Sequence, residues 1–180
     1  MQALTICTPT SISYTGTSAT INDDGSVSFT ATSDLALDGV FSATYNDYVI
    51  FYRANWNTTI STVPQITLRA SGVNDTSTKW GQPYWGTYGS STEGSAQDGL
   101  TATYPGIIAN VDPNGSPIYF LGPYETKGTG LISTSCIGQD GARIRDYANS
   151  HDSATSWDGF RFRTGSNTIT GKLTVYGFTK

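Results

Sequence analysis

The chain has 180 residues with a formal net charge of −4, and charged side chains make up only 13% of it. This length fits a single domain, which buries enough surface to fold without a metal or disulfide bonds. The acidic balance argues against a nucleic-acid partner, because proteins that bind nucleic acids carry a basic surface that neutralises phosphates. The sequence contains no run of about 20 apolar residues that would predict a membrane span, and no signal peptide is expected at its start.

The composition favours β-strands over helices. Thr and Ser number 28 and 20, whereas the good helix formers Glu, Lys and Met number only two, four and one. Turn residues separate short candidate strands at spacings of about ten residues, which is typical of an antiparallel β-sandwich or jelly roll. We therefore predict an all-β fold in one domain over residues 1–180, in which residues 1–17 are a candidate N-terminal arm or attachment strand.

The first half of the chain contains three strand patterns. Two short apolar segments flank Asn22–Gly25, whose Asp-Gly pair provides the positive φ angles of a tight hairpin turn. The segment Asp47–Ala54 is apolar on both faces, which predicts a central strand covered on both sides by two layers or by a neighbouring subunit. The segment Gln65–Ser71 alternates between apolar and polar residues, as a half-buried strand does.

The second half of the chain is less regular until its end. Between Lys79 and Gly99 the sequence does not distinguish a strand from a long surface loop. Asp140–Ser150 is the only candidate helix, although Gly138–Asp146 also fits a strand that follows an Asp-Gly turn. The last segment, Ile169–Phe178, is predicted to pair antiparallel with Asp158–Arg163 and to lie inside a sheet. Further strands are predicted at Ile107–Val111, Ile118–Leu121, Leu131–Ile137 and Trp157–Thr164.

The sequence holds no arrangement of side chains that predicts an enzyme. Its single histidine, His151, lies in a polar segment and is expected to be a solvated loop residue rather than a member of a catalytic triad. Most of the 12 Asp side chains lie in turn sequences, which explains them without acid–base catalysis. Cys7 and Cys136 lack zinc-binding spacing, and we expect two buried free thiols, with a disulfide as the alternative in an oxidising compartment. We therefore expect no catalytic residue, no metal and no cofactor.

The best binding candidate is a cluster of aromatic residues in the middle of the chain, interleaved with glycines. Flat rings stack on the C–H faces of sugars, and neighbouring polar side chains bind the hydroxyl groups. The alternative is ordinary packing in the core or against another subunit, because a chain with 12% aromatic residues must bury some of them. Trp56 and Trp157 are expected to be buried. The candidate glycan-binding residues are Trp80, Tyr84, Trp85 and Tyr88.

Several segments resemble a known family. Ser156–Phe162 and Asn167–Phe178 are similar to the closing "DGF…ITG…VYGY" hairpin of small structural proteins of tailed bacteriophages, described as minor tail, tail-fibre or head-surface proteins. Upstream, Tyr45–Ile50 and Gln65–Gly72 resemble the strand pair "Y-x-x-Y-x-I … L-R-x-x-x-G" of that family. The resemblance covers residues 26–180, and its motifs are fold-forming and contain no catalytic residues.

The resemblance implies a β-sandwich that assembles as a homo-oligomer, commonly a trimer, with other virion proteins as its partners. It implies a location on the virion, after assembly in the cytoplasm of the bacterial host. The first function that it predicts is a tail-fibre or minor tail protein that contacts the host surface, with a host glycan as the candidate ligand. The alternatives are a capsid decoration or head-fibre protein and, third, a free carbohydrate-binding module.

Overall fold

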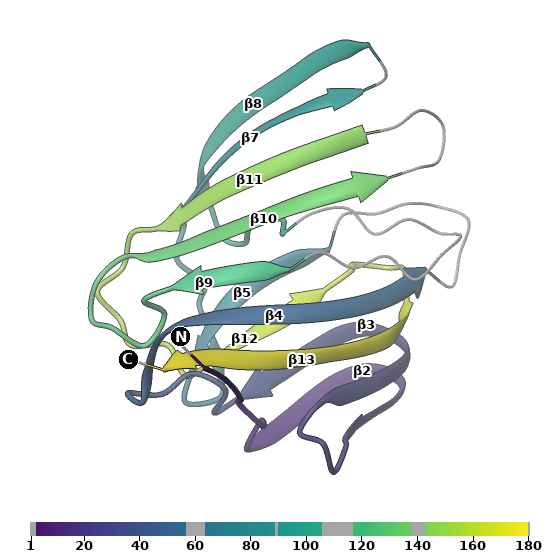
Figure 1. Ribbon diagram of the computed structural model, residues 1–180, viewed down its shortest axis with the longest axis vertical. Helices are drawn as coiled ribbons and strands as arrows, with labels where there is room; N and C mark the ends of the chain where they lie inside the picture. The colour runs from purple at the N-terminus through teal and green to yellow at the C-terminus, as the bar shows by residue number, and fades with distance from the viewer. Residues whose placement is uncertain (1–2, 57–63, 89, 106–116, 138–142, 180) are drawn as a thin grey trace.

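The computed structural model describes residues 3–56, 64–88, 90–105, 117–137 and 143–179 (Figure 1). All regular elements in these ranges are β-strands, and every strand pair is antiparallel. The side chains of Trp56, Tyr88 and Cys136 lie outside the described part of the chain. The strands are β1 (Leu4–Ile6), β2 (Ser11–Ile21), β3 (Val27–Asp38), β4 (Tyr45–Trp56), β5 (Gln65–Ala70), β6 (Val73–Asn74), β7 (Trp80–Tyr88), β8 (Ser91–Leu100), β9 (Ile118–Leu121), β10 (Thr129–Ile137), β11 (Arg143–His151), β12 (Gly159–Arg163) and β13 (Ile169–Thr179).

The 13 described strands form one open sheet that folds over itself. One layer contains β13, β4 and β9 and continues through β10, β11, β7 and β8 (Figure 1). The second layer contains β6, β5, β12 and the C-terminal half of β3. Within the predicted N-terminal arm, β1 pairs with β13 and the first residues of β2 pair with β3, so both segments are strands of this sheet. The prediction of an all-β, sandwich-like fold is confirmed.

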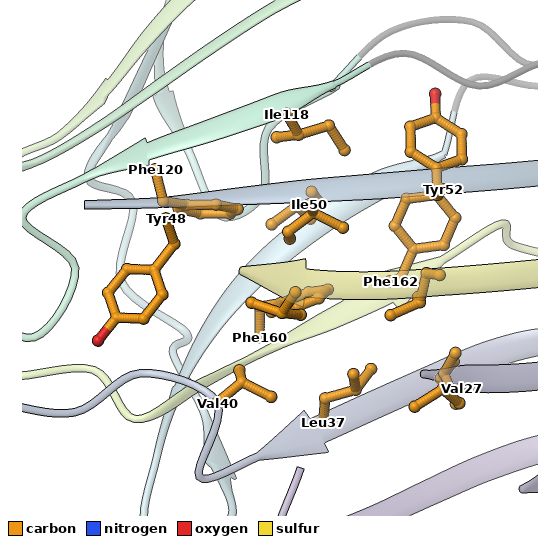
Figure 2. Close-up of a cluster of buried hydrophobic side chains, with 14 of the residues drawn as sticks. Val27, Leu37, Val40, Tyr48, Ile50, Tyr52, Ile118, Phe120, Phe160 and Phe162 are labelled. Atoms are coloured by element: carbon orange, nitrogen blue, oxygen red, sulfur yellow. The ribbon is translucent and has the colours of Figure 1, made fainter. Parts of the chain in front are cut away.

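The core lies between the two layers, where every second side chain of the facing strands points inward. Phe160 and Phe162 of β12 are buried, and they meet Phe120 of β9 and Tyr52 of β4 from the other layer (Figure 2). The ring centroids of Phe120 and Phe160 lie 6.0 Å apart, and those of Tyr52 and Phe162 lie 5.7 Å apart. Aliphatic side chains complete the cluster, including Val27, Leu35, Leu37, Val40, Ile50, Ile66, Leu68, Ile118, Leu173 and Val175.

Strand β3 belongs to both layers because the β2–β3 hairpin is bent in its middle. The N-terminal half of β3 pairs with β13, and its C-terminal half pairs with β12. At the bend, Gly16 has a φ of 147° and Ala31 a φ of 45°. The Ala31 amide donates a hydrogen bond to Oγ1 of Thr170 at 2.9 Å, which compensates for the disrupted ladder.

The predicted pairing of the last two strands is wrong, although β13 does lie inside the sheet as predicted. Strand β3 lies between β12 and β13, and both strands pair with it. The end of β12 is tied to the same strand, because the Thr164 amide donates to the Ser33 carbonyl at 2.9 Å. The alternation in the two segments was compatible with any antiparallel partner, and the bent β3 offers a hydrogen-bonding edge to each of them.

Other sequence-based expectations are settled by the strand assignment. The ambiguous segment from Lys79 to Gly99 forms the hairpin of β7 and β8, and the candidate helix over 140–150 is wrong because β11 occupies its described part. The predicted strand at Ile107–Val111 lies outside the described residues.

Cys7 is a buried free thiol, as predicted, and burial raises the pKa of this thiol. The described residues contain no helix long and apolar enough to cross a membrane.

The bend predicts that Gly16→Ala is strongly destabilising. A Cβ atom at Gly16 would lie 2.3 Å from the Ala31 carbonyl oxygen, where no side chain fits. We expect a loss of about 2–5 kcal/mol in the free energy of unfolding, measured with urea. The matched control is Gly165→Ala, which also has a positive φ, of 72°, but open space around it. It should lose only about 1–2 kcal/mol, and equal losses in the two variants would contradict this role of the bend.

Burial of tyrosine in the core predicts that the fold loses stability in alkali. Burial raises the pKa of Tyr52 well above its ordinary value of about 10. The unfolded chain therefore releases this phenolic proton at a lower pH than the folded chain, so stability is full below about pH 10 and falls as the pH rises further. When the pH is raised from about 8 to about 11, the free energy of unfolding should fall less in Tyr52→Phe than in the native chain. Tyr14→Phe, at an exposed tyrosine of β2, is the control and should follow the native curve.

Candidate functional site

Strand β7 places the predicted glycan-binding residues on opposite faces of the sheet, because side chains alternate along a strand. Trp80 and Tyr84 lie on the inner face, where Trp80 is fully buried and Tyr84 is half-buried. Trp85 lies on the outer face and is 64% exposed. The side chain of Tyr88 is outside the described residues. The structure therefore brings Trp80 and Tyr84 to one face without Trp85, and these three rings do not form a common platform.

Tyr84 takes part in a closed polar cluster on the inner face. Its ring centroid lies 5.8 Å from that of Tyr147, and the guanidinium of Arg145 sits 4.6 Å above its ring. Arg145 donates two hydrogen bonds to the carboxylate of Glu93 on β8, at 2.5 and 2.9 Å. This carboxylate raises the pKa of Arg145, so the guanidinium stays charged, and the bidentate pair ties β11 to the edge strand of the sheet.

His151 is buried, and the prediction of a solvated loop histidine is wrong. It ends β11 with no exposed surface, and its ring makes edge contacts with Trp80 and Trp157 at centroid distances of 4.8 and 5.4 Å. Its Nε2 atom lies 2.7 Å from Oδ2 of Asp75. Because an ionised carboxylate only accepts hydrogen bonds, Nε2 carries the proton of this contact. The polar residues next to His151 in the sequence led to the prediction of a solvated loop. Its neighbours in the strand point to the other face of the sheet, so they do not indicate the surroundings of the His151 ring.

The His151–Asp75 pair has the geometry of a structural contact rather than of a catalytic dyad. The other ring nitrogen of His151, Nδ1, has no hydrogen-bond partner among the described residues, so no nucleophile is aligned with it. Both side chains are almost completely enclosed, at 0% and 11% exposure. Asp75 also accepts from the amide and hydroxyl of Ser77, which fixes the segment after β6. Among the described residues, no three His, Cys, Asp or Glu side chains gather where they could bind a metal.

The outer face of the larger layer is the candidate functional surface. Register partners share a face, and Trp85, Asp146 and Thr134 form one row across β7, β11 and β10. A second row joins Ile132 of β10 to Tyr119 of β9 and continues through β4 and β13 to β1. We call the exposed apolar residues of this face the outer patch, and they are Leu4, Ile6, Phe51, Trp85, Tyr119, Leu121, Ile132 and Ile144.

The outer patch contains most of the exposed large hydrophobic side chains of the described chain. Of ten large hydrophobic side chains that are exposed there, eight belong to the outer patch, and only Tyr14 and Val73 lie elsewhere. Their exposed fractions range from 38% for Tyr119 to 64% for Trp85. Clusters of exposed apolar side chains on one face of a soluble protein mark candidate sites of association. The geometry of the outer patch is therefore that of a docking surface.

The side chains of the outer patch are held in place by their neighbours. The rings of Phe51 and Tyr176 meet edge to face at a centroid distance of 5.8 Å. Thr134 donates a hydrogen bond of 2.6 Å to Asp146, next to Trp85 in the same row. The Trp85 ring lies over Gly94 of β8, where an added Cβ atom would be 3.0 Å from it. An ordered apolar surface loses little side-chain entropy when a partner covers it.

The sequence revealed only part of the outer patch. The segment Asp47–Ala54 was recognised as apolar on both faces, and its outward residue Phe51 belongs to the outer patch. The same signal is present in Ile118–Leu121, where Tyr119 and Leu121 point outward between buried Ile118 and Phe120. The sequence around Ile132 and Ile144 does not show a segment that is apolar on both faces. Each of the two is an isolated apolar residue among polar neighbours on its own face.

Comparison with solved structures gives weak likenesses, among them those to a phage module and to an arabinanase domain. No family model and no curated protein sequence matches the chain. The CBM2 module of the evolved Dit of Lactobacillus casei BL23 phage J-1 is similar with a TM-score of 0.32 and 10% identity, over 99% of this chain and 98% of that one. Domain 4 of AbnA, a GH43 extracellular arabinanase from Geobacillus stearothermophilus in complex with arabinotriose, has a TM-score of 0.29 and 12% identity, over 99% and 84%. Scores this low do not establish a shared fold or function.

The enclosure of His151 predicts a structural phenotype for its replacement. His151→Ala removes the hydrogen bond to Asp75 and leaves a cavity between two tryptophans, so we expect a loss of about 2–4 kcal/mol in unfolding free energy. Asp152→Ala, at the exposed next residue, is the control and should change stability by less than about 0.5 kcal/mol. Urea titration followed by tryptophan fluorescence measures both. Native stability in His151→Ala would contradict the packing described above.

Proposed function

We propose that this chain is a structural subunit of a tailed-phage virion that self-associates through the outer patch and contacts the host surface as a tail-fibre or minor tail protein. The observation that carries the proposal is the outer patch itself, which runs across strands from β1 to β7, while the opposite side of β13, β4 and β9 is already packed in the core. A subunit of a larger assembly needs such a face, whereas an isolated binding module does not.

The placement of the family-like segments supports this proposal. The segments Tyr45–Ile50 and Gln65–Gly72 contribute β4 and β5, and those near the C-terminus contribute β12 and β13. These strands carry the side chains that join the two layers, among them Tyr48, Leu68 and Phe160. The resemblance to phage structural proteins thus concerns the residues that form the core of this fold.

A second copy of the chain is the proposed occupant of the outer patch. Identical subunits around a closed symmetry axis bury complementary surfaces against one another, so the outer patch of each copy can be covered by the next copy. The family resemblance favours three copies around a threefold axis. Other virion proteins would then bind outside the outer patch, and the acidic net charge of −4 gives no support for a nucleic-acid partner.

Among the described side chains of the original aromatic cluster, Trp85 is our candidate for the predicted host-glycan contact. Trp80 is fully buried, and half-buried Tyr84 already contacts Arg145 and Tyr147 with its ring. Trp85 lies at the far end of the outer patch, on the strand next to the edge strand β8. In our proposal it contacts a host saccharide at the rim of the assembly.

Electron microscopy of virions labelled with an antibody against this chain tests the location. Label at the tail is the expected result, and label on the capsid would replace the tail assignment with head decoration. Unlabelled virions that are shown by immunoblot to lack the chain would overturn the virion proposal altogether.

The outer patch predicts that a single charge on it disrupts self-association. We expect the native chain to elute as a homo-oligomer in size-exclusion chromatography with light scattering, and Ile132→Lys to shift it to the mass of one chain. Ile132 is 46% exposed near the middle of the outer patch, so a lysine there can fold into the monomer but is costly to bury against a neighbour.

Val73→Lys is the matched control for this substitution. Val73 is 68% exposed on β6 and lies away from the outer patch, so the oligomer should persist in this variant. Circular dichroism checks that both variants keep the β-sheet fold. A native chain that stays monomeric at micromolar concentration would contradict the proposed self-association.

A further inference from the structure

A separate pocket lies at one end of the sandwich, where three connections meet. Its walls come from the residues before and at the start of β4, from the β9–β10 connection and from the segment between β11 and β12. The cavity has a volume of about 530 Å³, within the range of about 300–1,000 Å³ typical of small-molecule sites. The lining residues are Ala43, Tyr45, Asn46, Tyr124, Glu125, Thr126, Lys127 and Ser156.

The two tyrosines of the pocket are anchored before any ligand arrives. Both rings pack against the hydrophobic core and remain half-exposed. The Tyr45 ring rests on Gly177 of β13, where an added Cβ atom would lie 2.4 Å from it, and it meets Tyr48 edge to face at 5.9 Å. Tyr48 in turn fixes the preceding loop, because its hydroxyl donates to the Ser42 carbonyl at 2.8 Å. A ring held in this way binds a ligand without a large loss of side-chain entropy.

Hydrogen bonds also fix the turn that carries Tyr124 and Glu125. The Gly122 amide contacts both the Asn46 carbonyl and the Asp47 carboxylate at 3.1 Å, and the Glu125 amide donates to the Gly122 carbonyl at 3.1 Å. The Trp157 amide donates to the carbonyl of Pro123 at 2.9 Å. These hydrogen bonds tie the turn before Glu125 to two other parts of the chain, so the polar side chains that follow project from a fixed backbone.

The charged groups around the pocket are two carboxylates and one ammonium group. Glu125 and Lys127 form an ion pair at the rim, and Asp47 lies beside it in a neighbouring depression. This set carries no excess of positive charge that would attract an anionic ligand. It does provide carboxylate and amide oxygens that accept hydrogen bonds, together with amide, ammonium and hydroxyl donors.

The neighbouring depression extends the pocket. It has a volume of about 400 Å³ and shares Asn46, Glu125 and Lys127 with the first. The shared side chains therefore stand between two hollows in the same surface, which is an arrangement suited to consecutive units of a chain-like ligand rather than to one compact molecule.

We propose that the pocket between Tyr45 and Tyr124 binds an uncharged hexopyranose unit of a glycan, which stacks on the tyrosine rings while Asn46 and Glu125 bind its hydroxyl groups. A sugar ring has apolar C–H faces and a polar rim of hydroxyls, and the pocket pairs anchored rings with hydrogen-bonding groups in the same way. This site does not depend on virion membership or on self-association, and it is distinct from Trp85.

Saturation-transfer NMR on the isolated chain tests the proposal. The probes are the methyl glycosides of glucose, galactose, mannose and N-acetylglucosamine, with glucuronate as the anionic comparison. We expect saturable binding of at least one neutral glycoside in the millimolar range, as a single small ring allows. Tyr124→Ala should weaken it by about fivefold or more, as the loss of one stacking ring implies. Glu125→Gln keeps the shape of the pocket but replaces the hydroxyl-binding carboxylate, so it should also weaken binding.

Trp85→Ala is the matched aromatic control, and it should bind the glycoside as the native chain does. Circular dichroism shows whether each variant is folded, and the isosteric Glu125→Gln variant preserves the test if Tyr124→Ala does not fold. The proposal is overturned if no neutral glycoside binds, if glucuronate binds more tightly, or if Glu125→Gln retains native affinity. Loss of binding in Trp85→Ala alone would also overturn it and would leave the Trp85 contact of the proposed function standing.

Discussion

The bend in the β2–β3 hairpin is the constraint on which the rest of the fold depends. A flat sheet of this many strands would leave both faces open, whereas the bend at Gly16 and Ala31 sends β3 from one layer into the other. Each half of β3 then finds a different partner, and the inward side chains of the two layers meet in one core. Two residues with positive φ thus decide where the apolar faces of distant strands come together.

The same topology makes the two layers unequal. Beyond β9 the larger layer continues through β10, β11, β7 and β8, and its inner side there combines buried Trp80 and Leu131 with polar contacts such as those of Arg145 and Asn149. On the outer side the residues of the outer patch remain exposed from β1 to β7, although Val49 of β4 in the same row is buried. An extended layer of this kind gains stability when a further surface covers it, which connects the topology to the proposed self-association.

Assembly and the pocket of Tyr45 and Tyr124 would use different parts of the molecule. The outer patch is built on regular strands, where cross-strand neighbours hold each apolar side chain in register. The pocket of Tyr45 and Tyr124 is built on connections at one end of the sandwich, which can vary in sequence without disturbing the core. This separation lets one fold keep its association surface while its binding surface changes.

The sequence by itself determined the fold class, the turn at Asn22–Gly25 and the inward faces of β5 and β13, because composition and alternation are local properties. Tertiary structure decided that β3 separates β12 from β13, that His151 is enclosed by tryptophans, and that Trp80 and Trp85 part to opposite faces. Alternation shows which residues of a strand share a face, but not which strand it pairs with or which face stays uncovered. Hydrogen bonds and packing between segments far apart in the chain settle both questions, because the same local pattern is compatible with many partners.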